Sequence, residues 1–178
     1  MMNGTKFYGK YRGTVTNNID PEQRGRLQII VPDVTNFIPS TWAMPCFPWA
    51  GAQMGVYLIP PVGAGVWVEF EQGKLEDPIW VGCWWGSTPE VPTTASGQTT
   101  PGSPVMVIQS LTQGSLIISD VPVPPMTAPG VMVNSGQASS ITVDAQGITI
   151  TAPTITLRAT SVNITGVTDI NAGAFKVT

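Results

Sequence analysis

Hydrophobic and polar positions in the first half of the chain alternate with the period of β-strands. The stretch Tyr11–Asn17 alternates and ends at a polar turn, and Leu27, Ile29 and Val31 then fall on one face of the next segment. Three further segments of the same character follow, at residues 55–60, 65–73 and 78–86. No window has the 3.6-residue period of an amphipathic helix. About five short strands with glycines at their bends predict a small closed β-barrel.

The second half has a seven-residue apolar rhythm between Ser140 and Gly166. Apolar pairs two residues apart recur at this interval, and the eight residues are Ile141, Val143, Ile148, Ile150, Ile155, Leu157, Val162 and Ile164. Coiled coils also repeat every seven residues, but their apolar positions lie three and four apart. A separation of two places both side chains on one face of a strand. The pattern therefore predicts a short strand plus a corner, repeated four times, with Gly147 and Pro153 among the corner residues.

Four such units cannot shelter their own apolar side chains, because a solenoid needs several stacked coils to bury a continuous core. Three chains wound together would bury them, with each chain contributing one strand per level. We expect the eight residues to form this trimer core, with a gross burial energy of about 40 kcal/mol per trimer before entropy is subtracted. Three upstream segments resemble longer units of the same kind, at residues 104–110, 114–120 and 130–136.

The predicted fold is therefore all-β and has two parts. Residues 1–86 are expected to form an OB-fold barrel, and residues 105–178 an intertwined triple-stranded β-helix in a homotrimer. Residues 87–104 are rich in Pro, Ser and Thr, which predicts a linker. The charges agree with this division, because fourteen of the nineteen charged residues lie in the first 90 positions.

The composition points to an interface rather than to a membrane or to nucleic acid. Only 11% of residues are charged, well below the quarter typical of globular domains, and this apolar excess predicts an oligomer or partner surface. No segment offers the roughly 18 unbroken apolar residues of a membrane-spanning helix. A net charge of −3 gives no basic patch, so we expect no nucleic-acid partner.

Candidate catalytic and metal-binding residues are few. The chain has no histidine, which excludes Ser-His-Asp and Cys-His arrangements and histidine ligation of zinc. Cys46 and Cys83 have neither metal-ligand nor disulfide spacing and are expected to be buried. Glu69 and Glu71 lie two apart on one face of a predicted strand, but no apolar pocket nearby would raise the pKa of either. We therefore expect no enzyme activity, no cofactor and no metal.

The six tryptophans leave alternatives open. They could stack on bases or sugars, as in many OB-fold proteins, but the first part has six basic residues against eight acidic ones. Barrel packing and protein contact are favoured, and an OB-fold carbohydrate- or nucleic-acid-binding module is the alternative. That module would be a monomer with salt-dependent binding. A glycosidase using Glu69 and Glu71, and a receptor-binding fibre, are the other rivals.

Four stretches carry a resemblance to a known family. They are "RGRLQIIVP" at Arg24–Pro32, "PWAG" at Pro48–Gly51, "IPPVGAGVWVEFEQG" at Ile59–Gly73 and "DPIWVGCWWG" at Asp77–Gly86. Residues 8–86 resemble the OB-fold domain of phage baseplate central spikes. The same domain occurs in valine-glycine-repeat (VgrG) spikes of type VI secretion and in related extracellular contractile injection systems. The second half of that family is a trimeric, triangular β-helix, so the resemblance extends to the rest of the chain in architecture.

This resemblance implies a non-enzymatic, homotrimeric spike that sheath contraction drives through a target envelope. The linker is too short for the lysozyme domain of some phage spikes, and a separate trimeric hub protein at the tube end is implied. "MMNGTKFYGKYRG" has no apolar signal-peptide core, so we expect synthesis in the cytoplasm and assembly into a phage tail or tail-like particle, with membrane contact only on puncture.

Some family spikes bind iron at the tip through histidines, which this chain lacks. Its last residues are therefore expected to contact a separate PAAR-type tip protein, and a frayed terminus is the alternative. The candidate contact residues are Ala174, Phe175, Lys176, Val177 and Thr178.

Overall fold

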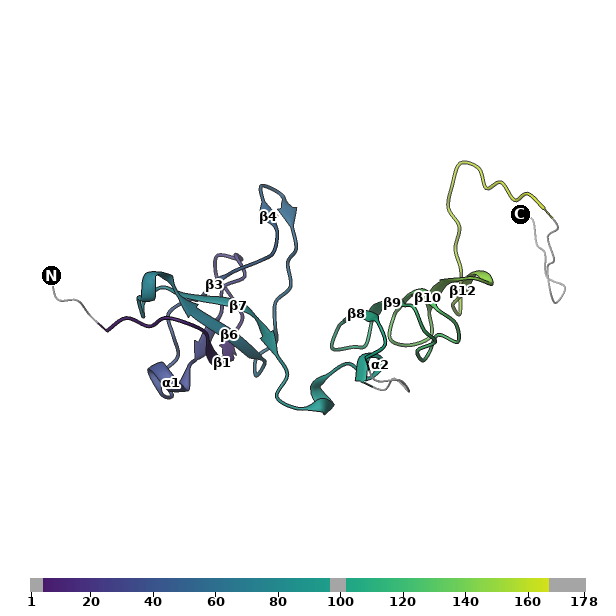
Figure 1. Cartoon of the computed structure of the whole chain (residues 1–178). Helices are drawn as coiled ribbons and strands as arrows, with labels where there is room; N and C mark the ends of the chain where they lie inside the picture. The colour runs from purple at the N-terminus through teal and green to yellow at the C-terminus, as the bar shows by residue number, and fades with distance from the viewer. Residues whose placement is uncertain (1–4, 97–101, 167–178) are drawn as a thin grey trace. The chain divides into compact units, whose positions relative to one another are not determined.

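The computed structural model describes residues 5–96 and 102–166, and the chain divides into two compact units, Met1–Ser96 and Gly97–Thr178 (Figure 1). Nearly all the regular structure is β, as predicted. The helical segments of the described residues are short: α1 (Pro32–Thr35), η1 (Glu71–Gly73), η2 (Thr88–Glu90) and α2 (Thr93–Ser96). The expected domain boundaries at residues 86 and 104 stay a prediction.

The first unit contains a five-stranded sheet in the order β2-β1-β6-β7-β3, which forms a half-barrel. Its strands are β1 (Tyr11–Asn17), β2 (Gln28–Ile30), β3 (Met44–Pro45), β6 (Gly65–Phe70) and β7 (Pro78–Trp84). All neighbours are antiparallel except β3 and β7, which are parallel. A separate hairpin pairs β4 (Ala50–Gly51) with β5 (Met54–Gly55).

The core of this unit follows from the period-two alternation of its strands. Leu27, Ile29 and Val31 are completely buried, as their predicted common face requires. They pack with a larger apolar cluster that includes Val15, Val66, Val68, Phe70 and Trp80. The buried indole of Trp80 donates its N–H to the Gly25 carbonyl at 3.0 Å, so its one polar group is satisfied.

Two local expectations for this unit are wrong. The predicted strand at residues 55–60 does not form, and Tyr57 and Leu58 are exposed. Pro60 ends this segment and Pro61 follows it, and proline removes the backbone donor that a sheet ladder needs. Cys46 and Cys83 are exposed rather than buried. Cys83 lies in β7, whose inward positions belong to Pro78 and Trp80.

A buried ion pair fixes the turn that leads into β2. The Asp20 carboxylate accepts the Arg26 guanidinium N–H at 2.7 Å and the backbone N–H groups of Glu22, Arg24 and Arg26 at 2.8 to 3.2 Å. The Arg26 guanidinium holds the pKa of Asp20 well below its ordinary value, and the backbone donors act in the same direction. Arg26 also lies over the Trp42 ring, 5.5 Å from its centroid.

Asp20→Asn is expected to lower the melting temperature of the first unit by several degrees. The NH2 group of asparagine would replace a carboxylate oxygen that now accepts hydrogen bonds, so the donors facing it would lose their acceptor. Because the pKa of Asp20 is lower in the folded state than in the unfolded state, its carboxylate stabilises the fold at pH values above the unfolded pKa of about 4. This contribution disappears as the pH falls through the pKa of the folded state. The difference between wild type and variant should therefore be constant from pH 7 to about pH 4 and shrink below it.

Thermal unfolding followed by tryptophan fluorescence measures this effect separately, because all six tryptophans lie between Trp42 and Trp85. Asp77→Asn is the control, since that side chain is 48% exposed and pairs with Lys74 at the surface. Equal melting temperatures for both variants would contradict a structural role of Asp20.

The second unit is one antiparallel meander of five strands in the order β12-β11-β10-β9-β8 (Figure 1). The strands are β8 (Val105–Gln109), β9 (Ser115–Ser119), β10 (Gly130–Asn134), β11 (Ser140–Asp144) and β12 (Gly147–Thr151). The three upstream units and the first two seven-residue units are therefore strands. The last two units, around Ile155 and Val162, contain no strand.

The pairing of β11 and β12 differs from the expectation of one strand per level from each chain. These strands pair with each other, with Ile141 opposite Ile150 and Val143 opposite Ile148. The turn between them passes through Ala145 and Gln146. It is closed by Gly147, whose φ of 138° suits glycine. A seven-residue interval is produced here by a tight hairpin within one chain.

Candidate assembly surface

The registers of the second sheet align its side chains in rows across all five strands. One face carries two complete rows, in which every residue is Ile, Leu, Val or Met. The first row is Met106, Ile118, Val131, Val143 and Ile148, and the second is Ile108, Leu116, Val133, Ile141 and Ile150. We call this surface the two-row face.

The two-row face is uncovered in the single chain. Apart from the half-buried Leu116, its members are exposed by between 37% (Val131) and 71% (Ile148). Isolated exposed aliphatic residues are ordinary, but nine contiguous ones without a polar side chain among them mark an interaction surface.

The centre of the opposite face of the same sheet is covered by its own chain. Ile117 and Met132 lie at its centre and are buried against Val123 and Met126 from the loop between β9 and β10. That loop is fastened by hydrogen bonds, among them the Ser119 hydroxyl to the Val121 carbonyl at 2.8 Å. The chain thus supplies a cover for one face and leaves the two-row face to another molecule.

The structure brings four of the eight predicted core residues into this surface. They are Ile141, Val143, Ile148 and Ile150. The other four, Ile155, Leu157, Val162 and Ile164, follow the sheet along the chain and are exposed by 52 to 69%. Their assignment to a trimer core stays a prediction. The candidate tip contacts at residues 174–178 lie outside the described residues.

Sequence reasoning missed six members of the two-row face. They are Met106, Ile108, Leu116, Ile118, Val131 and Val133. In β8 and β9 apolar residues occupy both faces, so alternation does not indicate which side faces outward. Turn geometry does not supply the missing information, because residues 120–129 form a long loop between β9 and β10 and leave their register unspecified by the sequence.

The two glutamates considered for catalysis are not paired in the first unit. Glu69 lies in β6 and forms an ion pair with Lys10 at the surface. Glu71 lies beyond the strand, in η1, where its backbone N–H donates to the Asp77 carbonyl at 2.9 Å. The expectation that both share one strand face is wrong, because β6 ends at Phe70.

Several tryptophans have structural partners. Trp67 and Trp84 enclose the Arg12 guanidinium, which lies 5.6 and 5.2 Å from their ring centroids. The Trp84 indole also packs on Gly65, where a β-carbon would lie 2.6 Å from the ring. Its N–H donates to the Val66 carbonyl at 3.1 Å. Trp49 and Trp85 are exposed.

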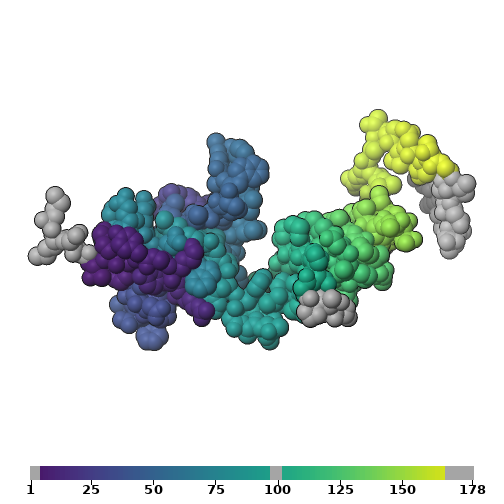
Figure 2. Space-filling view, viewed as in Figure 1, coloured from purple at the N-terminus to yellow at the C-terminus, as the bar shows by residue number. Residues whose placement is uncertain are grey.

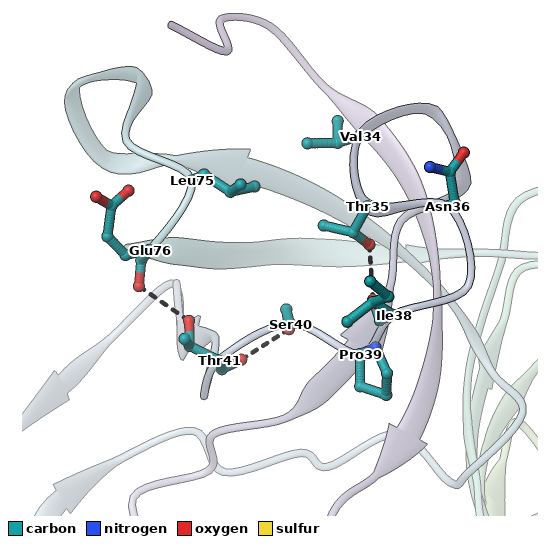
Figure 3. Close-up of a pocket in the computed structure, with 9 residues that line it drawn as sticks. All are labelled: Val34, Thr35, Asn36, Ile38, Pro39, Ser40, Thr41, Leu75 and Glu76. Carbon is teal, nitrogen blue, oxygen red and sulfur yellow. Dashed lines mark hydrogen bonds between the residues drawn. The ribbon is translucent and has the colours of Figure 1, made fainter. Parts of the chain in front are cut away.

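The first unit has a hollow of about 560 Å³ beside α1 (Figure 3). Its wall is held by hydrogen bonds from the Thr35 hydroxyl to the Ile38 carbonyl at 2.7 Å and from the Thr41 hydroxyl to the Glu76 carbonyl at 2.9 Å. Val34 and Leu75 supply apolar lining, and the one ionisable side chain in it is Glu76. Such a lining suits an apolar side chain of a partner better than acid–base chemistry.

Across residues 5–96 and 102–166, no group of three His, Cys, Asp or Glu side chains is placed to hold a metal ion. Nor does any helix in those two ranges have the length and apolar character to cross a membrane.

Comparison with known families agrees with both units. Residues 11–85 match the type VI secretion system/phage-baseplate injector OB domain. Residues 105–176 match the phage baseplate V C-terminal trimerisation domain. The chain belongs to the phage baseplate V family. A comparison with curated proteins finds no match. In this family member the two-row face lies wholly within the trimerisation domain, which supports a homotrimer.

Ile150→Asp is expected to abolish the trimer, because it would place three carboxylates in an apolar core around one axis. Thr149→Asp is the matched control, since Thr149 directly precedes Ile150 in β12 and points to the opposite face. Multi-angle light scattering should report a monomer for the first variant and a trimer for the second. Equal masses for the two variants would show that the faces are assigned wrongly.

Proposed function

We propose that this chain is the homotrimeric central spike of a contractile injection system or phage-like baseplate. The observation that carries the proposal is the two-row face, an apolar surface with no cover of its own, on a trimerisation domain joined to an injector OB domain.

Three copies would place their two-row faces around a common axis. Burying the exposed half of ten aliphatic side chains contributes about 10 kcal/mol per protomer, before association entropy is subtracted. The resulting core would be rich in β-branched side chains, which have few accessible rotamers. A core of this kind resists compression, which is the mechanical demand on a spike.

The proposed role divides between the units. The OB unit attaches the spike to a separate trimeric hub at the tube end, and the hollow beside α1 is a candidate contact for an apolar hub side chain. The trimerisation unit is the rigid needle, which sheath contraction drives through the target envelope. A PAAR-type protein covers its end, and membrane contact occurs on puncture.

The spike acts mechanically in this proposal. Glu69 is occupied by Lys10 and Glu71 lies on another element, so this pair lacks the arrangement of a glycosidase. The chain is made in the cytoplasm and becomes part of a phage tail or tail-like particle.

In solution the full chain is expected to have a mass of about 56 kDa, three times its 18.8 kDa, and to resist SDS at room temperature. In assembled particles, an epitope-tagged chain should appear by electron microscopy as three-fold density at the baseplate end of the tube. Particles built with Ile150→Asp should lack that density.

The Thr149→Asp chain is the control for both measurements and should assemble normally. A folded monomer that binds oligonucleotides or glycans in a salt-dependent way would instead support the OB-fold binding module.

A further inference from the structure

Three side chains on the outward face of the first sheet form a clamp around a guanidinium group. Arg12 lies opposite Trp67 in the pairing of β1 with β6, and its guanidinium contacts the rings of both Trp67 and Trp84. The centroids of the two rings are 6.3 Å apart, and their planes are tilted by 52°. We call these three residues the arginine clamp.

An extra residue in β7 turns Trp84 toward the clamp. The register of β6 with β7 shifts between Trp67 and Val68, where Val81 is the additional residue of β7. Trp80, before this bulge, is buried, and strict alternation would turn Trp84 to the same inward face. Bulges re-aim side chains in this way and are frequent beside functional sites.

The Trp84 ring is fixed by its own unit. Its indole N–H is bonded to the Val66 carbonyl, and Gly65 leaves the space in which the ring packs. A guanidinium stacked on a fixed ring is already oriented before a ligand arrives. It therefore loses little conformational freedom when it binds.

The guanidinium of Arg12 has no acidic partner. The other two arginines of the first unit, Arg24 and Arg26, both form ion pairs. Within residues 5–96 and 102–166, the Arg12 side chain forms no ion pair and no hydrogen bond. Glu69 is the nearby carboxylate on the same sheet face, but it is paired with Lys10. The clamp therefore presents an uncompensated positive charge and a planar set of N–H donors.

The clamp differs from the other exposed aromatic surface of this unit in its support. Trp49 directly precedes the hairpin of β4 and β5, which projects from the body of the first unit (Figure 2). The clamp instead lies on three paired strands of the main sheet. Side chains on a sheet are positioned more precisely than side chains on a projecting loop.

We propose that the arginine clamp binds the carboxylate of an Asp or Glu side chain on a partner protein. The guanidinium fork matches a carboxylate in a bidentate arrangement, and Trp and Arg are the residues that dominate the energetics of protein interfaces. A phosphate backbone would favour a wider basic patch, whereas here the neighbouring charges are one ion pair.

This inference rests on the proposed function in one respect, because it assigns a contact to the unit that attaches the spike. It specifies the chemistry of that contact. The clamp itself is complete within one protomer, so carboxylate binding does not require the trimer.

Fluorine NMR of the full chain labelled with 5-fluorotryptophan tests the clamp. The chain has six tryptophans, and Trp67→Phe and Trp84→Phe assign the two resonances of interest. The probe is acetyl-Gly-Glu-Gly-amide, and acetyl-Gly-Gln-Gly-amide is the uncharged peptide of the same size. We expect the glutamate peptide to shift both resonances in a saturable way, with a millimolar Kd. The glutamine peptide should bind at least about tenfold more weakly, because charge-assisted hydrogen bonds are the stronger ones.

Arg12→Gln should remove the response to the glutamate peptide. Arg24→Gln is the matched control, since it makes the same change of charge at a surface ion pair elsewhere in the unit. It should bind the peptide like wild type. The comparison of the two peptides on wild type needs no variant and therefore decides the question even if Arg12→Gln does not fold.

Equal responses to the two peptides, or full binding by Arg12→Gln, overturn the proposal. A lower melting temperature of Arg12→Gln without any preference for the glutamate peptide in wild type would leave the clamp as packing alone. Tighter binding of inorganic phosphate or oligothymidylate than of the glutamate peptide would assign it to a phosphate ligand instead. The proposed spike fails separately, by a monomeric mass of wild type in light scattering.

Discussion

A five-stranded sheet with apolar side chains on both faces needs a cover on each face. The chain covers one face, where Val123 and Met126 pack on Ile117 and Met132. The two-row face has no such cover, and hydrocarbon of that extent is costly to leave in water. The proposed trimer and its needle depend on this one unmet demand, and the match to a trimerisation domain agrees with it.

The first unit is built on the opposite principle. Its half-barrel buries Leu27, Ile29 and Val31 completely, and the Asp20–Arg26 pair fixes the turn before β2 from within the same chain. One chain therefore joins a unit with a complete core to a unit whose core is completed by association. This division suits the proposed spike, in which the first unit attaches to a hub and the second unit carries load.

The sequence predicted where most of the strands lie better than it predicted which strands pair. Period-two alternation correctly predicted β1, the buried face around Ile29, and the strands β8 to β12. It failed where alternation carries no information about partners. A seven-residue interval arises equally from a hairpin or from a corner, and between β11 and β12 the hairpin is closed by Gly147 at a φ of 138°. The strand expected at residues 55–60 failed because a local proline pair outweighs apolar content.

The two-row face contains no ionisable group and no side-chain hydrogen-bonding atom, since each member is Ile, Leu, Val or Met. Cohesion from such a surface is almost indifferent to acid and to ionic strength. Cooling is expected to weaken the association of this surface, because the entropic attraction between hydrocarbon surfaces decreases at low temperature.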